Sequence, residues 1–155
     1  MKNLKNKNIL VTGGARGIGS QIAIEFAKHG ANIIICDADK NFMNSKAFID
    51  TVNEIKSFGV ECIYYHLDVV DIEIIKEVRE KIIQDLGKID ILVNNAGVVF
   101  GGKFLDVDID KHHLTYDVNT QGVINMTYIF LQDLKSKDAS HIVNIASASS
   151  FTPLP

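Results

Sequence analysis

A glycine-rich segment close to the N-terminus contains the residue types that most clearly suggest chemistry. Residues 12–19 read TGGARGIG and lie between a short apolar run at 9–11 and a stretch of helical periodicity. Glycines let the backbone approach a ligand closely, because a Cβ would block both the tight turn and the ligand. The N–H groups at the start of the following helix can bind a pyrophosphate. This context predicts a phosphate-binding turn, although a plain strand-to-helix turn would contain similar residues.

Asp37 directly follows a second apolar run, residues 33–36, and is a further candidate for ligand binding. A carboxylate in this place can accept hydrogen bonds from both hydroxyls of an adenosine ribose, and it repels a 2′-phosphate. Aspartate is also common in solvated turns, which is the plainer interpretation. The upstream glycine turn favours ribose binding, Asp39 adds negative charge, and Ala38 offers no cation for a phosphate. These residues favour NAD over NADP.

The elements that would position these residues alternate along the chain, since short apolar runs are separated by longer stretches of helical periodicity. Strands are expected near residues 9–11, 33–36, 62–65, 89–93 and 142–145, and helices near 18–27, 41–58, 72–86 and 110–134. Strands that are apolar on both faces and separated by helices form a parallel sheet covered on each side. With right-handed crossovers, the expected fold is an α/β, doubly wound, Rossmann-type sheet of about five strands.

Polar residues follow the later strands as well. Asp68 comes after the third strand, where a helix cap is the plainer interpretation, but Asp71 is better placed to cap the next helix. The segment NNAG at 94–97 follows the fourth strand, and Ser147 follows the fifth. Asn119 lies inside the long predicted helix, where asparagine is locally unfavourable. Either a functional role or a buried polar contact would explain it.

These motifs together resemble those of the classical short-chain dehydrogenase/reductase family. Residues 12–19, with the spacing Gly-x-x-x-Gly-x-Gly, are similar to the cofactor motif of that family, and NNAG at 94–97 is similar to its second motif. Asp68-Val69 and VNTQG around Asn119 match two more, and IVNIAS at 142–147 resembles the strand that presents the catalytic serine. The motifs occur in the family's order and extend over essentially the whole chain.

The resemblance implies a role for each matching residue. Asp68 would contact the adenine amino group, and Asn95 and Ala96 would line the adenosine side of the cleft. Arg16 points toward NADP, which stays the less favoured alternative because Asp37 favours NAD. The residues expected to bind the cofactor are Thr12, Gly13, Arg16, Gly17, Ile18, Gly19, Asp37, Asp68, Val69, Asn95, Ala96 and Gly97.

Two residues are expected to be catalytic by the same resemblance. Ser147 would polarise the carbonyl or hydroxyl of the substrate, because a hydroxyl donor stabilises the charge that develops on that oxygen during hydride transfer. Asn119 would hold a water molecule in a proton relay. No metal site is expected, because the two cysteines, Cys36 and Cys62, and the histidines have no metal-ligand spacing.

The family's general acid/base, a tyrosine followed four residues later by a lysine, has no counterpart here. No tyrosine of this sequence has a lysine four residues later. By resemblance the pair would lie about a dozen residues beyond Ser147, past Pro155, to reach the same substrate oxygen. Loss of a positioned acid/base costs about 100- to 10,000-fold in rate. We therefore expect negligible turnover from this chain alone, as for the N-terminal part of a longer enzyme.

Composition limits the remaining possibilities. The 155 residues are 46% hydrophobic and 23% charged, which suits a single globular domain over residues 1–155. A net charge of -3 gives no reason to expect nucleic acid as a partner. No run approaches the roughly 20 apolar residues of a membrane span, and the two cysteines are expected to be reduced, as in a cytoplasmic protein.

Two functions are consistent with this sequence. The first is an NAD(P)-dependent oxidoreductase that transfers a hydride between nicotinamide and a secondary alcohol or ketone, with a full-length form that is a homo-oligomer. The second is a noncatalytic nucleotide-binding or interaction module. Nucleotide binding without turnover would favour the second.

Overall fold

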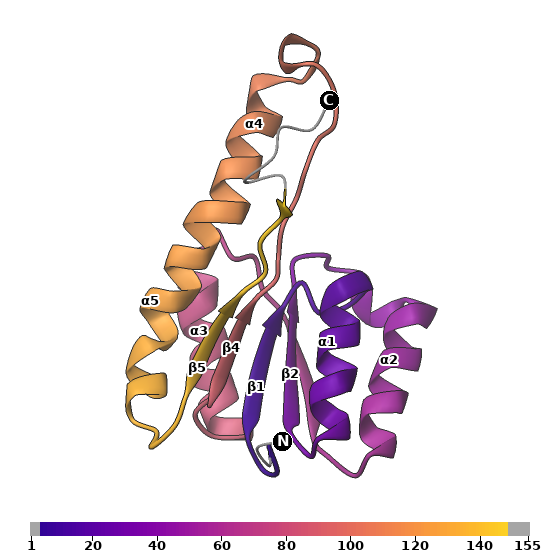
Figure 1. Ribbon diagram of the computed structural model, residues 1–155, viewed down its shortest axis with the longest axis vertical. Coiled ribbons are helices and arrows are strands. Elements are labelled where there is room, and N and C mark those ends of the chain that lie inside the picture. Colours follow the sequence, from indigo (N-terminus) through magenta and orange to yellow (C-terminus); the bar gives the residue numbers. More distant parts are fainter. Residues whose placement is uncertain (1–3, 149–155) are drawn as a thin grey trace.

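Five parallel strands form the centre of the computed structural model, which describes residues 4–148 (Figure 1). They are β1 (Asn8–Thr12), β2 (Asn32–Asp37), β3 (Cys62–His66), β4 (Ile91–Asn94) and β5 (His141–Asn144). Their order in the sheet is β3-β2-β1-β4-β5, and every neighbouring pair is parallel. This confirms the expected doubly wound α/β fold. The order reverses between β1 and β4, and ligands of such sheets bind beyond the carboxyl ends of the strands at this point.

Helices cover both faces of the sheet. They are α1 (Gly17–Lys28), α2 (Lys46–Ser57), α3 (Ile72–Asp85), α4 (Ile109–Tyr116) and α5 (Gly122–Lys135), with short 3-10 helices η1 (Phe42–Asn44) and η2 (Phe104–Asp106). A π-helical turn, η3 (Asp117–Gln121), joins α4 to α5. Figure 1 shows α1 and α2 on one face of the sheet and α3 and α5 on the other.

The two faces of the sheet bury separate apolar cores because side chains alternate along each strand. On β1, Ile9 and Val11 pack with α1 and α2, whereas Leu10 between them packs with α3 and α5. On β2, Ile33 lies in the first core and Ile34 in the second. All five side chains have no solvent exposure. Coverage on both sides explains why these two strands are apolar without polar alternation.

The helix expected over residues 41–58 is divided in the structure, which corrects that prediction. Ser45 has an extended backbone, and its side-chain oxygen accepts a hydrogen bond from the N–H of Phe48 at 3.3 Å. A serine that satisfies a free N–H in this way begins a helix, so α2 starts at Lys46. The preceding turn buries Phe42, whose ring meets Phe48 edge-on at 4.7 Å.

The long helix expected over residues 110–134 is present, but its backbone changes partway along. Residues 109–116 are α-helical, residues 117–121 form the π-helical turn η3, and residues 122–135 are α-helical again. A π turn inserts one residue into a helix and occurs often at functional sites. Asn119 lies within it.

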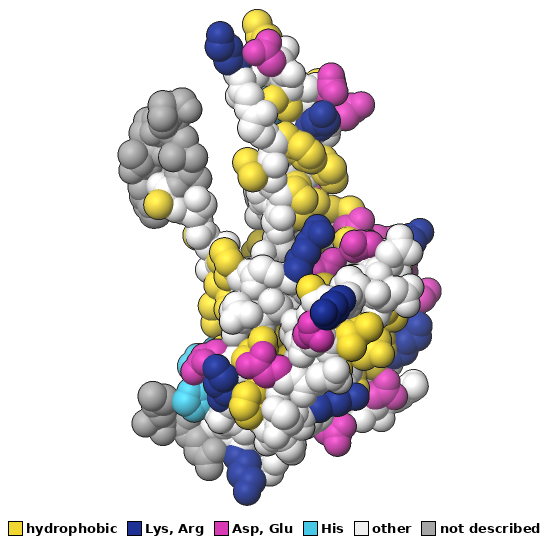
Figure 2. All heavy atoms as spheres, turned by 90° about the vertical axis from the view of Figure 1, so that its right-hand side faces the viewer, with side chains coloured by type: hydrophobic (Ala, Val, Ile, Leu, Met, Phe, Trp, Pro, Cys, Tyr) yellow, Lys and Arg dark blue, Asp and Glu magenta, His cyan; other side chains and the backbone are white. Residues whose placement is uncertain are grey.

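Residues 98–116, here called the arm, project beyond the carboxyl end of the sheet (Figure 1). Apolar side chains gather along the projecting part (Figure 2). The exposed apolar residues of the arm are Val99, Phe100, Phe104, Leu105, Ile109, Leu114 and Tyr116. None of the helices within residues 4–148 has the length and apolar character needed to cross a membrane.

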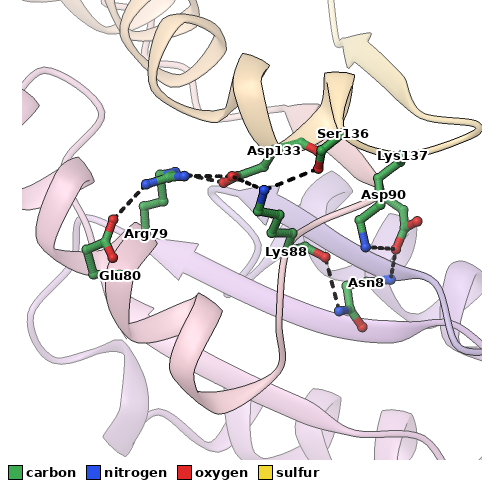
Figure 3. A network of polar contacts seen from close by, with 8 residues as sticks. All are labelled: Asn8, Arg79, Glu80, Lys88, Asp90, Asp133, Ser136 and Lys137. Atoms are coloured by element: carbon green, nitrogen blue, oxygen red, sulfur yellow. Dashed lines mark hydrogen bonds and ion pairs between the residues drawn. The ribbon is translucent and has the colours of Figure 1, made fainter.

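At the amino ends of the strands, which is the end of the sheet opposite the arm, charged side chains join α3 and α5 to the sheet (Figure 3). Asp133 of α5 is 1% exposed and accepts two hydrogen bonds from the Arg79 guanidinium of α3, at 2.6 and 2.7 Å. Asp90, before β4, is 3% exposed and accepts one from Lys7 Nζ at 2.8 Å, with Lys137 Nζ 3.6 Å away. Paired in this way, two buried carboxylates connect α3, α5 and the entry of the sheet.

Candidate functional site

A cleft of about 490 Å³ lies beyond the carboxyl ends of the strands, where the sheet order reverses. It brings together most residues predicted to bind a cofactor, although they come from four separate segments of the chain. The predicted residues that line it are Gly13, Arg16, Ile18, Gly19, Asp37, Asp68, Val69, Asn95, Ala96 and Gly97. Thr12 and Gly17 are not among its lining residues.

The glycines of the first turn are held against the turn after β4. Gly13 has φ +60°, which favours glycine, and a Cβ built on it would lie 3.0 Å from the Cα of Ala96. A Cβ on Gly19 would collide with the carbonyl oxygen of Gly13. Two backbone segments therefore pass each other without space for a side chain, as a cradle for a ligand requires.

Helix α1 begins at this cradle with its backbone N–H groups uncapped by a side chain. Arg16 occupies the N-cap position with an extended backbone, its side chain makes no capping hydrogen bond, and the first turn contains no acidic residue. The N–H groups of Gly17, Ile18 and Gly19 have no acceptor within the helix, since the first bond of the helix runs from Ser20 N–H to Arg16 O. An anion bound here would accept from these groups and interact favourably with the helix dipole.

Thr12 lies behind the cleft and ties β1 to the turn after β4. It is 1% exposed, and its hydroxyl oxygen accepts hydrogen bonds from the N–H groups of Asn95 and Ala96, both at 3.0 Å. Asn95 in turn donates through Nδ2 to the carbonyl oxygens of Thr12 and Gly13, at 2.9 and 3.1 Å. These bonds hold the glycine turn in place across the switch point of the sheet.

The Asp37 carboxylate, at the end of β2, is half-buried and lines the cleft. Its Oδ2 accepts a hydrogen bond from Ala15 N–H at 3.2 Å, and its Oδ1 accepts one from Asp39 N–H at 3.1 Å. A carboxylate has about four acceptor positions. The remaining ones can accept hydroxyl groups of a ligand, while the two backbone bonds fix the orientation of the carboxylate.

Asp68 lines the cleft and does not cap a helix. Its Oδ1 accepts a hydrogen bond from Val70 N–H at 3.1 Å, two residues along the chain. The cap of α3 is Asp71, whose Oδ1 accepts from the N–H groups of Glu73 and Ile74, both at 3.1 Å. The sequence interpretation that Asp71 is the cap is therefore confirmed.

Three apolar residues that the sequence interpretation missed also line the cleft: Leu67, Leu114 and Val118. Leu114 and Val118 are four residues apart on consecutive turns of α4 and η3, so they share a face. That spacing could have indicated an apolar face, but nothing local shows which cavity it covers. Leu67 directly precedes Asp68, and its N–H donates to Asp37 O at 2.9 Å.

The two residues predicted to be catalytic do not line this cleft. Asn119 is held by the backbone of Val98: its Oδ1 accepts from Val98 N–H and its Nδ2 donates to Val98 O, both at 2.8 Å. This pair fastens the start of the arm to the π turn. Ser147 is exposed and lies three residues beyond Asn144, the last residue of β5.

The two cysteines take no part in the site. Burial raises the pKa of the Cys62 thiol to about 11, and burial together with the charge of Asp37 raises the pKa of Cys36 even more. Both thiols are therefore protonated at neutral pH and are weak nucleophiles. Within residues 4–148, no group of His, Cys, Asp and Glu side chains could hold a metal ion.

Comparison with known proteins places this architecture in a family. A sequence model of the family described as short chain dehydrogenase matches residues 7–155. Short-chain dehydrogenase/reductase 3 of Bos taurus is 35% identical over 155 residues, which is 100% of this chain and 50% of that protein. The chain thus spans about half the length of this curated relative.

Solved structures share the fold closely. NAD+-bound xylitol dehydrogenase superposes with a TM-score of 0.86 and 27% identity, over 99% of this chain and 58% of that one. A blue fluorescent protein from a metagenomic library, in complex with NADPH, superposes with a TM-score of 0.84 and 29% identity, over 95% of this chain and 58% of that one. With the sequence match over residues 7–155, these findings show that the chain belongs to the short-chain dehydrogenase family.

Proposed function

We propose that this chain is the nucleotide-binding half of an NAD-dependent oxidoreductase. The observation that carries the proposal is the uncapped start of α1 beside a backbone cradle. A pyrophosphate would accept hydrogen bonds from the N–H groups of residues 17–19, beside the close backbone approach that Gly13 and Gly19 allow. The cleft volume of about 490 Å³ lies within the usual range of ligand pockets, about 300–1,000 Å³.

The rest of the nucleotide would lie along the cleft. In this proposal Asp37 accepts the adenosine ribose hydroxyls, Asp68 accepts the adenine amino group, and Asn95 and Ala96 line the adenosine side. Leu67, beside Asp68, supplies apolar surface for the base. The nicotinamide group, when bound, supplies the site that accepts or gives the hydride.

NAD is the preferred cofactor in this proposal, and NADP is the alternative. The 2′-phosphate of NADP would meet Asp37, and Asp39 also lines the cleft. Like charges brought together cost several kcal/mol, so the cleft rejects that phosphate. Arg16 is the cation among the described residues that line the cleft, and it favours NADP.

The substrate class is a secondary alcohol or ketone, a small molecule. Ser147 Oγ would donate a hydrogen bond to the substrate oxygen, where charge develops during hydride transfer. Asn119 would act by fastening Val98 at the base of the arm, since both ends of its amide already bond that residue. A role for Asn119 in holding a water molecule would then use its backbone rather than its side chain.

We expect the full-length form to be a cytoplasmic homo-oligomer with no nucleic acid or membrane partner. Ile124, Tyr128 and Leu131 are exposed on α5 and support a contact between copies. Size-exclusion chromatography with light scattering on the full-length form would measure its mass. A monomer would contradict the expectation.

Titration calorimetry with NAD, NADP and ADP-ribose tests the cofactor proposal. We expect NAD and ADP-ribose to bind, and NADP to bind at least about tenfold more weakly, which is 1.4 kcal/mol. Asp37→Ala should remove most of that difference. Asp50→Asn, which changes an exposed aspartate of α2, is the matched control and should leave it unchanged. A wild-type chain that binds none of the three compounds would contradict the proposal.

An assay of NADH formation with secondary alcohols separates the two functions that the sequence allows. We expect the 155-residue chain to bind NAD and to show negligible turnover, because no tyrosine here has a lysine four residues later. Turnover should appear in a full-length form that supplies such a pair. Binding without turnover in the full-length form would favour a noncatalytic nucleotide-binding module.

A further inference from the structure

His66, the last residue of β3, contacts the turn that follows Asp37, and the function proposed above gives it no role. Its Nε2 lies 3.1 Å from the carbonyl oxygen of Ala38. A carbonyl oxygen can only accept, so Nε2 carries a proton and donates the hydrogen bond. The parallel register of β2 and β3 sets His66 opposite Asp37 and so brings the ring beside this turn.

The bond from His66 acts on the Asp37 carboxylate through a single peptide group. The C=O of Ala38 and the N–H of Asp39 belong to the same planar unit, in which they point in opposite directions. That N–H donates to Oδ1 of Asp37 at 3.1 Å. A donor that fixes the direction of the C=O therefore also fixes the direction of the N–H. Hydrogen bonds in such a series strengthen one another.

The other oxygen of Asp37 is held from the opposite side. Its Oδ2 accepts from Ala15 N–H, in the glycine turn, at 3.2 Å. The carboxylate is thus fixed between the glycine turn and the peptide that joins Ala38 to Asp39. Both Ala38 and Asp39 are exposed and line the cleft. Leu67 N–H holds the carbonyl oxygen of Asp37 at the start of this turn, and the contact from His66 holds the next carbonyl, that of Ala38.

We infer that His66 is a positioning residue that orients the Asp37 carboxylate and thereby sets the preference for a ribose 2′-hydroxyl over a 2′-phosphate. This inference rests on the proposed function of the cleft. Without the donor, the peptide can rotate and the carboxylate can turn away from the 2′-position. Discrimination between the two cofactors should then decrease more than affinity for NAD.

The test compares His66→Phe with His66→Gln in the full 155-residue chain. Phenylalanine keeps a ring of similar shape without the donor, whereas glutamine keeps an N–H donor. The readout is the ratio of the dissociation constants of NADP and NAD, measured by calorimetry on the same samples. An unfolded fraction affects both constants equally, so it cancels in the ratio. We expect H66F to lower the ratio about 2- to 10-fold, the effect of one hydrogen bond, and H66Q to retain it.

His112→Phe is the matched control, since His112 Nε2 also lies 3.1 Å from a backbone carbonyl oxygen, that of Phe104, but on the arm. H112F should leave the ratio unchanged. An unchanged ratio in H66F, alongside a changed ratio in Asp37→Ala, would overturn the role of His66 and leave the proposed function intact. If H66F does not fold, His66→Leu with the same readout serves in its place. A wild-type chain that binds neither nucleotide would overturn both.

Discussion

At the scale of single residues, Gly19 occupies the most crowded backbone position of the cleft. A Cβ there would collide with the carbonyl oxygen of Gly13 and with Nδ2 of Asn95. That same Nδ2 donates to two carbonyl oxygens of the glycine turn, so it cannot move aside without breaking those bonds. Gly19→Ala should lower the free energy of unfolding by about 1–3 kcal/mol, the cost of overpacking. It should also weaken NAD binding at least about tenfold, and urea unfolding and calorimetry would measure the two effects.

The control for this prediction is Gly101→Ala. Nothing lies within 4 Å of a Cβ built on Gly101, and its backbone is outside the left-handed region. The substitution should change both quantities little. Equal NAD affinity in G19A and the wild type would mean that the turn tolerates the extra methyl group and that the cradle is wider than its backbone contacts indicate.

Several motif residues form hydrogen bonds with backbone groups of this chain and do not line the cleft. Thr12 is nearly fully buried and bonds Asn95 and Ala96, while Asn119 bonds Val98 twice. The types and spacing of these residues predicted a site at this edge of the sheet. They could not predict these partners, because each contact joins segments that are more than twenty residues apart.

At the scale of elements, the start of α2 depends on one serine. Ser45→Ala removes the acceptor of the Phe48 N–H and should lower the free energy of unfolding by about 1 kcal/mol. Ser57→Ala, at the other end of α2, is the control. The Ser57 hydroxyl is exposed and donates to the carbonyl oxygen of Glu54, so its loss should cost less than about 0.5 kcal/mol. Equal losses in urea unfolding would show that Ser45 is not a functioning cap.

Gly122 determines how closely α5 approaches the cleft. A Cβ on Gly122 would collide with the side chain of Val69, which lines the cleft, and Asn125 of α5 also donates to Val69 O at 3.1 Å. Gly122→Ala should therefore lower the free energy of unfolding by about 1–3 kcal/mol and weaken NAD binding. Gln132→Ala, at an exposed position of the same helix, should change neither by a measurable amount. Unchanged NAD affinity in G122A would mean that the packing of α5 against Val69 does not affect nucleotide binding in the cleft.

Periodicity predicted most elements because β1, β2 and β4 are buried along most of their length and α1, α2, α3 and α5 each bury one apolar face. It failed where the backbone changes without changing that stripe. The apolar positions 48, 52 and 55 continue the same helical face up to the cap, so the break at Ser45 is hidden. The π turn at residues 117–121 shifts the pattern by a single residue within one long helical stretch, which hydrophobic spacing does not resolve.

At the scale of the whole molecule, the two ends of the sheet have separate roles. The carboxyl ends of the strands form the cleft, and the amino ends carry the charged contacts of Figure 3. Breaking the bond between Arg79 and Asp133 should therefore lower stability without changing the preference between nucleotides. Changes at Asp37 should alter the preference between nucleotides and leave stability nearly unchanged. Stability and cofactor choice can thus be altered independently in this fold.

The buried carboxyl group of Asp90 makes the stability of the whole chain depend on pH. Burial alone would raise the pKa of this carboxyl, but hydrogen bonds from Lys7 Nζ and Asn8 N–H, with the charge of Lys137, outweigh burial and lower it. A carboxyl with a lowered pKa in the folded state stabilises the fold above its unfolded pKa, about 3.9, and this contribution is lost as the pH falls through the folded value. Asp90→Asn should therefore cost about 1.5–3 kcal/mol at neutral pH, and the difference should shrink below about pH 4. Urea unfolding across this range measures it, with the exposed Asp50→Asn as control. A difference that stays constant into acid would show that the Asp90 pKa is not lowered.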